Sequence, residues 1–66
     1  MKIQLRKYEK GCTICAYDAQ GTCHINKVID KEEFDSVLIY YFDCGYDVKM
    51  VDDQGQSEEL YELELP

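Results

Sequence analysis

Apolar residues change their spacing twice along this chain, and the two changes restrict the fold more than any other feature. The opening MKIQLRKYEKG alternates apolar and polar residues, and CTICAY and TCHINKVI are rich in β-branched residues. The segment FDSVLIYYF then places apolar residues three and four positions apart, before YDVKMV and ELYELEL return to the shorter spacing. A period of two is typical of strands and a period of 3.6 of helices. We therefore predict an α+β fold of order β-β-β-α-β-β, an antiparallel sheet with one helix packed on one face.

Turn residues divide the first half of the chain into a strand and a hairpin. Lys10-Gly11 ends the first strand, and the four residues DAQG separate the next two. Asp18 at the first turn position and Gly21 at the fourth favour a type I turn closed by a left-handed glycine. Residues 12–28 are therefore expected to double back as a tight antiparallel hairpin.

The helix is expected to span residues 31–44. Asp30, with Glu33 three residues later, resembles a capping box that uses Asp in place of Ser or Thr. The apolar stripe of the helix would consist of Phe34, Val37, Leu38, Tyr41 and Phe42. Cys44 would lie at the edge of the core, and Gly45 is well placed to end the helix in a left-handed conformation.

A second hairpin is expected after the helix, around the turn residues DDQG. A three-residue loop would put the apolar residues of its two strands on opposite faces of the sheet. A loop of even length puts them on one face and is therefore favoured. That register aligns Tyr46, Val48 and Met50 with Leu63, Tyr61 and Glu59, in that order.

Length and composition indicate one small globular domain covering residues 1–66. A chain of this size buries only about 60% of its unfolded surface, but its hydrophobic fraction of 45% is too high for a disordered chain. No apolar run approaches the ~20 residues of a membrane helix, and the first residues lack the apolar core of a signal peptide. We therefore expect a cytoplasmic protein with no membrane partner, in which thiols stay reduced.

The segment CTICAYDAQGTCH holds three of the four cysteines and the only histidine, which raises the question of a metal or redox site. The spacing Cys12-x-x-Cys15 fits a zinc knuckle, with Cys23, His24 and Cys44 as further candidate ligands. A redox motif of the thioredoxin type would instead require the pair to lie at a helix N-terminus. Here the pair lies within an expected strand.

The expected hairpin conflicts with a zinc site that joins the first and third thiols. It would separate Cys12 from Cys23 by roughly 16–20 Å at ~3.3 Å per strand residue, whereas zinc–sulfur bonds are about 2.3 Å long. Cys15 and Cys23 would be the only pair close enough for a cross-strand disulfide. We therefore expect structural thiols, no metal ligands and no cofactor. A small zinc- or redox-linked cysteine module remains the alternative.

No arrangement of residues in the sequence indicates catalysis. Nucleophilic catalysis requires a base that a third group holds in place, and no such partner can be named for His24. The two serines, Ser36 and Ser57, fall on the helix and beside a turn. No glycine-rich loop precedes the helix to hold a phosphate group. We expect a protein that is not an enzyme and has no catalytic residues.

Charge is distributed unevenly along the chain, whose net charge is −7. Residues 1–29 carry five Lys or Arg against two acids, whereas residues 30–66 carry two Lys against twelve acids. The acids fall on the exposed side of the helix and on the final hairpin, and Tyr40 lies among those of the helix. Tyrosine is enriched at binding hot spots. The candidate partner-binding residues are therefore Glu33, Ser36, Tyr40, Asp43, Asp52, Asp53, Glu58, Glu59 and Glu62.

An acidic surface of this kind predicts a basic protein as the partner, of the class that handles nucleic acid. Acidic inhibitors that mimic nucleic acid, many of them viral proteins encoded by phages, share this character, which is an analogy of composition. The basic residues near the N-terminus are too few to bind nucleic acid directly under a net charge of −7. We therefore expect a regulatory or inhibitory protein-binding function. A solvated surface without a partner, and a structural subunit that self-associates as a homodimer, remain the alternatives.

Overall fold

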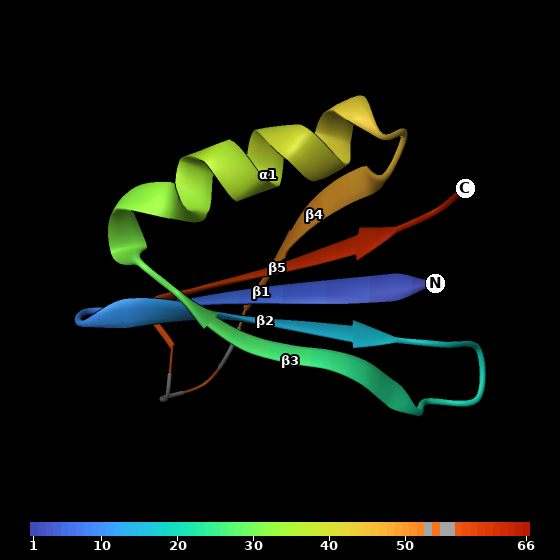
Figure 1. Cartoon of the computed structure of the whole chain (residues 1–66), viewed down its shortest axis with the longest axis horizontal. Helices are drawn as coiled ribbons and strands as arrows, with labels where there is room; N and C mark the ends of the chain where they lie inside the picture. The colour runs from blue at the N-terminus through green and yellow to red at the C-terminus, as the bar shows by residue number, and fades with distance from the viewer. Residues whose placement is uncertain (53, 55–56) are drawn as a thin grey trace.

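The alternating residues at the start of the chain form the central strand of a five-stranded antiparallel sheet (Figure 1). This computed structural model describes residues 1–52, 54 and 57–66. The elements are β1 (Lys2–Tyr8), β2 (Gly11–Tyr17), β3 (Cys23–Ile29), the 3₁₀ turn η1 (Lys31–Glu33), α1 (Phe34–Asp43), β4 (Asp47–Val51) and β5 (Glu59–Glu64). For the described residues, the predicted α+β fold with a helix across one face of the sheet is confirmed.

The strand order is β3-β2-β1-β5-β4, so β1 pairs with a strand on each side. Because a central strand is covered along both edges and by the helix above, Ile3 and Leu5 are almost completely buried. The core on the helix side of the sheet consists of Ile3, Leu5, Cys12, Ile14, Ala16, Ile29, Phe34 and Leu63.

α1 is anchored to this core at its N-terminal end. Phe34 is its one fully buried side chain among the described residues, and the Phe34 ring lies 5.5 Å from the Tyr61 ring between centroids. The ammonium of Lys7 lies 5.3 Å from the centroid of the same ring. Val37, Leu38 and Tyr41 are partly buried against the core. Within the part of the chain that the structure describes, no helix has the length and apolar character needed to cross a membrane.

Two expectations for the helix side chains are wrong. Phe42, expected in the apolar stripe, is 64% exposed, and Cys44, expected at the core edge, is exposed. The C-terminal part of α1 packs through Tyr41 onto Tyr46, which leaves the flanking position of Phe42 in solvent.

The start of the helix differs from the predicted capping box. Asp30 makes no side-chain hydrogen bond to the helix, and the backbone N–H of Glu33 donates to the backbone oxygen of Asp30 at 2.9 Å. The first turn is a 3₁₀ turn, in which this backbone bond uses the N–H that the Asp30 carboxylate would have accepted. The predicted span of residues 31–44 is otherwise confirmed as η1 followed by α1.

The helix ends, as predicted, at a glycine in the left-handed conformation. Gly45 has a φ of 96°, and its N–H donates to the Phe42 carbonyl at 3.1 Å. The N–H of Tyr46 donates to the Tyr41 carbonyl at 3.2 Å, and the two rings contact edge to face with centroids 5.4 Å apart. This is a Schellman motif with its accompanying hydrophobic contact.

Replacing Gly45 by alanine should lower the free energy of unfolding by about 1–2 kcal/mol, the cost of a left-handed residue that carries a Cβ. Apart from its chain neighbours, no described residue has an atom within 4 Å of the position that the new Cβ would occupy, so the cost is conformational. Urea unfolding measures it, with Gly11→Ala as the control, because Gly11 has no positive φ. Equal losses in the two variants would contradict this explanation.

The first hairpin folds at the predicted turn. Gly21 has a φ of 84°, and its N–H donates to the Asp18 carbonyl at 3.0 Å. The N–H of Asp18 donates in turn to the Thr22 carbonyl at 3.1 Å. The predicted antiparallel hairpin of residues 12–28 is therefore confirmed.

The second hairpin pairs β4 with β5 in a register that differs from the prediction by two residues. Val48 lies opposite Leu63, two residues beyond its expected partner. Tyr46 packs on the helix end instead of extending β4, and Leu63 is fixed by its pairing with β1. Because the shift is two residues, every side chain keeps its expected face. Residues 53 and 55 of the expected turn lie outside the described residues.

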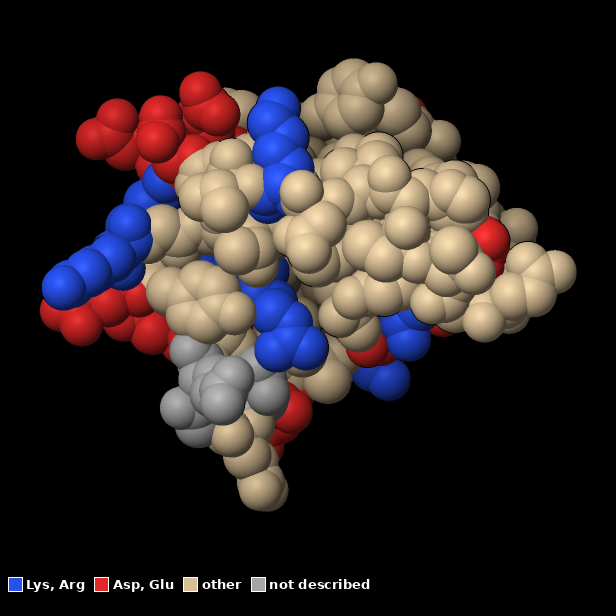
Figure 2. All heavy atoms as spheres, turned by 60° about the horizontal axis from the view of Figure 1, so that its bottom comes forward, with Lys and Arg blue, Asp and Glu red and all other residues tan. Residues whose placement is uncertain are grey.

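Among the described elements, no helix covers the face of the sheet opposite α1. Figure 2 shows this side: uncharged side chains cover most of its right half, and many of the carboxylates gather at its left margin. Leu60 is nevertheless 5% exposed, although it lies on the face opposite Leu63, with Arg6 and Val51 as its cross-strand neighbours. Leu60 is therefore a buried apolar residue on the face of the sheet opposite the main core.

Candidate partner-binding groove

An open groove lies between α1 and the edge strand β3. The helix is anchored towards β1 and β5 through Phe34, which leaves the β3 side of the sheet partly uncovered. The groove encloses about 570 Å³, a volume in the range of ligand-binding pockets. The sheet contributes Ile14, Ile25, Lys27 and Ile29 to its lining. The helix side contributes Glu33, Ser36, Val37, Tyr40 and Tyr41.

The two walls of the groove follow from the periods of a strand and a helix. Alternate residues of β3 point to the helix side of the sheet, and residues three and four apart on the helix share one face. The floor is buried, since Ile14 is 5% exposed, whereas Ile25 and Tyr40 in the walls are 44% and 63% exposed. The groove therefore presents apolar side chains that a partner could cover.

Tyr40 is held at the groove by a row of three tyrosines. Its ring meets the edge of the Tyr41 ring at 5.3 Å between centroids, and Tyr41 meets Tyr46 at 5.4 Å. Burial raises the pKa of the Tyr41 phenol, so this ring is neutral at neutral pH. The contact with Tyr41 therefore gives the exposed Tyr40 ring a defined orientation at the groove.

The structure brings three of the predicted partner-binding residues together. Glu33, Ser36 and Tyr40 line the groove from its helix side. The other predicted residues lie elsewhere: Asp43 is exposed at the C-terminal end of α1, Asp52 is exposed after β4, and Glu58 is exposed before β5. Asp53 lies outside the described residues.

The remaining two predicted residues lie on opposite faces of the sheet and pair with lysines of β1. Glu59 is on the helix side, 3.7 Å from the ammonium of Lys7. Glu62 is on the open face, 3.3 Å from Lys2, and accepts a hydrogen bond from the Gln4 amide at 3.1 Å. These pairs lie at the partly exposed surface, where an ion pair contributes about 0–1 kcal/mol, but they offset the charge that these carboxylates would offer a partner.

The thiols of the first hairpin are separated as its register requires. Cys12 is buried opposite Ile29 at one end, whereas Cys23 lies opposite Tyr17 beside the turn at the other. The two positions are five strand residues apart, about 16 Å at ~3.3 Å per residue, which is too far for one metal ion. Burial raises the pKa of the Cys12 thiol and so disfavours its reactive thiolate form. Among the described residues, no three or more His, Cys, Asp or Glu side chains are grouped to hold a metal.

Cys15 and Cys23 are free thiols with hydrogen-bond partners of their own. The Cys15 thiol lies 3.8 Å from the side-chain oxygen of Asn26, and the Cys23 thiol donates to the Ile25 carbonyl at 3.2 Å. The register makes the two cysteines diagonal neighbours, as predicted, because Cys15 lies opposite Asn26 and Cys23 opposite Tyr17. A hydrogen bond with Cys15 is the largest cause that raises the pKa of Tyr17.

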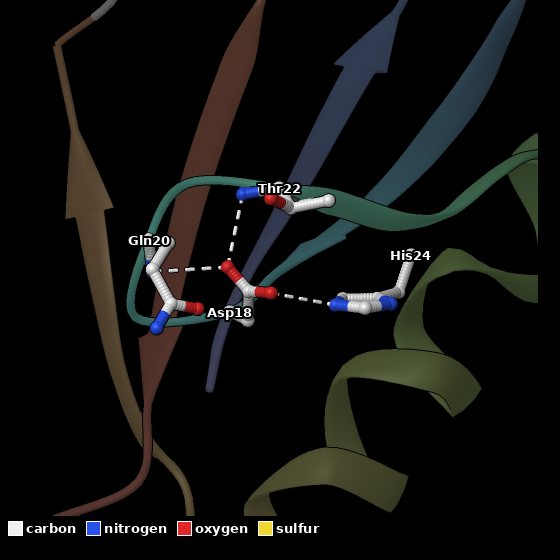
Figure 3. Close-up of polar contacts among 4 residues, drawn as sticks. All are labelled: Asp18, Gln20, Thr22 and His24. Atoms are coloured by element: carbon white, nitrogen blue, oxygen red, sulfur yellow. Dashed lines mark hydrogen bonds and ion pairs between the residues drawn. The ribbon is translucent and has the colours of Figure 1, made fainter.

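His24 has a partner that sequence reasoning missed, the carboxylate of Asp18 (Figure 3). The Nε2 atom of His24 lies 2.8 Å from Asp18 Oδ2, while Oδ1 accepts the backbone N–H groups of Gln20 at 3.0 Å and Thr22 at 2.9 Å. The aspartate at the first turn position was the available sequence signal for the backbone contacts, because Asp side chains in turns commonly accept a hydrogen bond from the backbone two residues later. The arrangement closes the β2–β3 loop around one carboxylate.

Lowering the pH should remove a stabilising contribution of this loop. The hydrogen bond with His24, followed by that with Thr22, lowers the pKa of Asp18 in the folded protein. The ionised Asp18 carboxylate therefore stabilises the fold fully above its ordinary pKa of about 3.9, and this stabilisation is lost as the pH falls through the lowered pKa. The difference in unfolding free energy between the wild type and Asp18→Asn should therefore shrink from pH 6 towards pH 2. A difference that stays constant over this range would exclude the assignment.

None of three comparisons, with protein families, with characterised proteins and with solved structures, found a match to this chain. The fold and the groove define an α+β domain in which a helix and an edge strand flank an open, mainly apolar site.

Proposed function

We propose that this protein acts by binding a basic protein, as a regulator or inhibitor without catalysis of its own. The observation that carries the proposal is the groove, where Glu33, Ser36 and the exposed Tyr40 lie together beside apolar residues of β3. An oriented tyrosine next to a partly exposed apolar surface is the usual composition of a binding hot spot.

The charge of the chain supports a basic partner. Its net charge of −7 attracts a positively charged surface over a distance of about one Debye length, roughly 8–10 Å at physiological salt. Proteins that handle nucleic acid carry such basic surfaces, so we propose a partner of this class. Binding here would then compete with nucleic acid for that surface.

The polar contacts of the first hairpin support a non-catalytic role. The Nε2 atom of His24 is hydrogen-bonded to Asp18. The thiols of Cys15 and Cys23 are hydrogen-bonded to Asn26 and Ile25, and not to the histidine. A nucleophile activated by a histidine would require a hydrogen bond between the two.

The association rate at different salt concentrations tests this proposal. Affinity capture from cells of the source organism and mass spectrometry would supply the partner. The association rate should fall roughly tenfold or more between low and high ionic strength, because charge steers the encounter. Glu33→Gln should slow association more than the matched variant Glu62→Gln, since Glu62 is already paired with Lys2. A rate that is unchanged by salt would rule out the electrostatic mechanism, and capture of no partner would favour a merely solubilising surface.

A further inference from the structure

β3 forms one edge of the sheet and one wall of the groove. Among the described strands its one neighbour is β2, so about half of its backbone N–H and C=O groups point away from the sheet. Natural edge strands are usually short, charged, bulged or covered. β3 extends over seven residues, contains Lys27 as its one Lys, Arg, Asp or Glu, and is irregular only at its Cys23 end. The opposite edge, β4, has five residues, including Asp47 and Lys49.

We propose that an extended segment of the basic protein partner adds to β3 as a further strand and places its side chains in the groove beside α1. This inference rests on the proposed function and specifies how the partner is bound. The backbone groups of the β3 edge would provide the main-chain hydrogen bonds, and the groove would provide side-chain selectivity.

The spacing of the groove residues suits an extended occupant. Ile25, Lys27 and Ile29 line the groove from alternate positions of β3, about 6.7 Å apart at normal strand rise. An added strand has the same repeat, so every second side chain would enter the space between β3 and α1. The half-exposed Ile25 and the exposed Tyr40 would cover those side chains, which we therefore expect to be aliphatic.

The charges around the groove favour a segment that also carries Lys or Arg. The helix lies in an acidic segment, residues 30–43, which contains five acids and one lysine. That lysine, Lys31, donates to the backbone oxygen of Glu9 at 3.2 Å. Glu33 lines the groove itself and would face a basic side chain of the segment. Lys27, in the opposite wall, has a long apolar stem that can keep its ammonium in water.

The same charges disfavour a second copy of this chain as the occupant. Pairing β3 with β3 of another copy would join two chains that each carry a net charge of −7. Bringing like net charges together costs binding free energy. A basic partner meets no such repulsion.

Peptides selected from a displayed library of random linear 12-residue sequences would serve as the probe. Selected binders should carry aliphatic residues at every second position, with one Lys or Arg in that same series to face Glu33. Ile25→Glu should weaken the affinity of a selected peptide at least tenfold, whereas Val28→Glu, on the same strand but the other face, should leave it within twofold. Binding should also slow hydrogen exchange of alternate β3 amides, which is the signature of new main-chain hydrogen bonds.

Recovery of no binding sequence, or of binders insensitive to Ile25→Glu, would overturn the inference. Protection of β3 amides that rises with protein concentration in the absence of peptide would identify a second copy as the occupant instead. The captured natural partner separates this inference from the proposed function. If Glu33→Gln slows its association but Ile25→Glu has no effect, protein binding stands and strand addition at β3 is wrong. Thermal unfolding of both β3 variants would confirm that each is folded.

Discussion

Replacing Phe34 by alanine is expected to remove a large part of the protein's free energy of unfolding. Phe34 is 2% exposed, and truncating a buried phenylalanine costs about 3–5 kcal/mol. At about 0.05–0.15 kcal/mol per residue, a 66-residue chain has a total stability of only roughly 3–10 kcal/mol. The variant also loses the ring contact with Tyr61 and the cation–π contact with Lys7, which together hold the N-terminal end of α1 on the sheet.

Phe42→Ala is the matched control, because it removes the same side chain from the same helix at a position that is 64% exposed. Its unfolding free energy should stay within about 0.5 kcal/mol of the wild type, as for most surface substitutions. Urea unfolding followed by circular dichroism measures both variants. Similar losses for the two would mean that the helix is not anchored through Phe34.

Replacing Tyr40 by alanine should weaken binding of the captured partner by about 2 kcal/mol or more, roughly thirtyfold. Tyr40 is 63% exposed in the free protein, and its orientation against Tyr41 makes its ring ready for contact. Covering this ring would bury a large amphipathic surface at a low cost in conformational entropy.

Two variants separate the role of Tyr40 in binding from a general effect on the helix. Tyr40→Phe keeps the ring and should retain most of the affinity, whereas Phe42→Ala removes an exposed ring that does not line the groove and should leave the affinity nearly unchanged. Calorimetric titration measures all three. If Tyr40→Ala binds as tightly as the wild type, the groove is not the binding surface.

Local patterns in the sequence were sufficient to predict the first hairpin and the helix. The turn at Asp18 and Gly21 depends on two residues that are three positions apart, and the helix end at Gly45 depends on one backbone conformation that glycine adopts readily. Neighbours along the chain decide such features. The failed capping box at Asp30 shows the limit, since side-chain and backbone acceptors compete for the same N–H group.

Long-range pairing could not be predicted in the same way. The pairing of β1 with β5 joins the two ends of the chain, and no local signal identifies it. That pairing fixes Leu63 against Ile3 and therefore the register of β4, which the sequence prediction missed by two residues. Leu60, which this pairing places opposite Arg6, is buried on the face of the sheet away from the helix.

The candidate site was predicted on its helix side and missed on its strand side. Helical spacing placed Glu33, Ser36 and Tyr40 on one face, and all three line the groove. The strand wall was missed because it depends on β3 being an edge strand, which follows only from the strand order. The pairing of Glu59 and Glu62 with lysines of β1 has the same origin.

Mapping the bound partner onto the chain tests the central claim, that binding occurs between α1 and β3. The captured partner would be titrated into isotopically labelled protein while backbone amide chemical shifts are followed. The largest changes are expected in residues 25–29 and 33–41, on the two walls of the groove. Changes confined to β4, β5 or the open face of the sheet would contradict the claim.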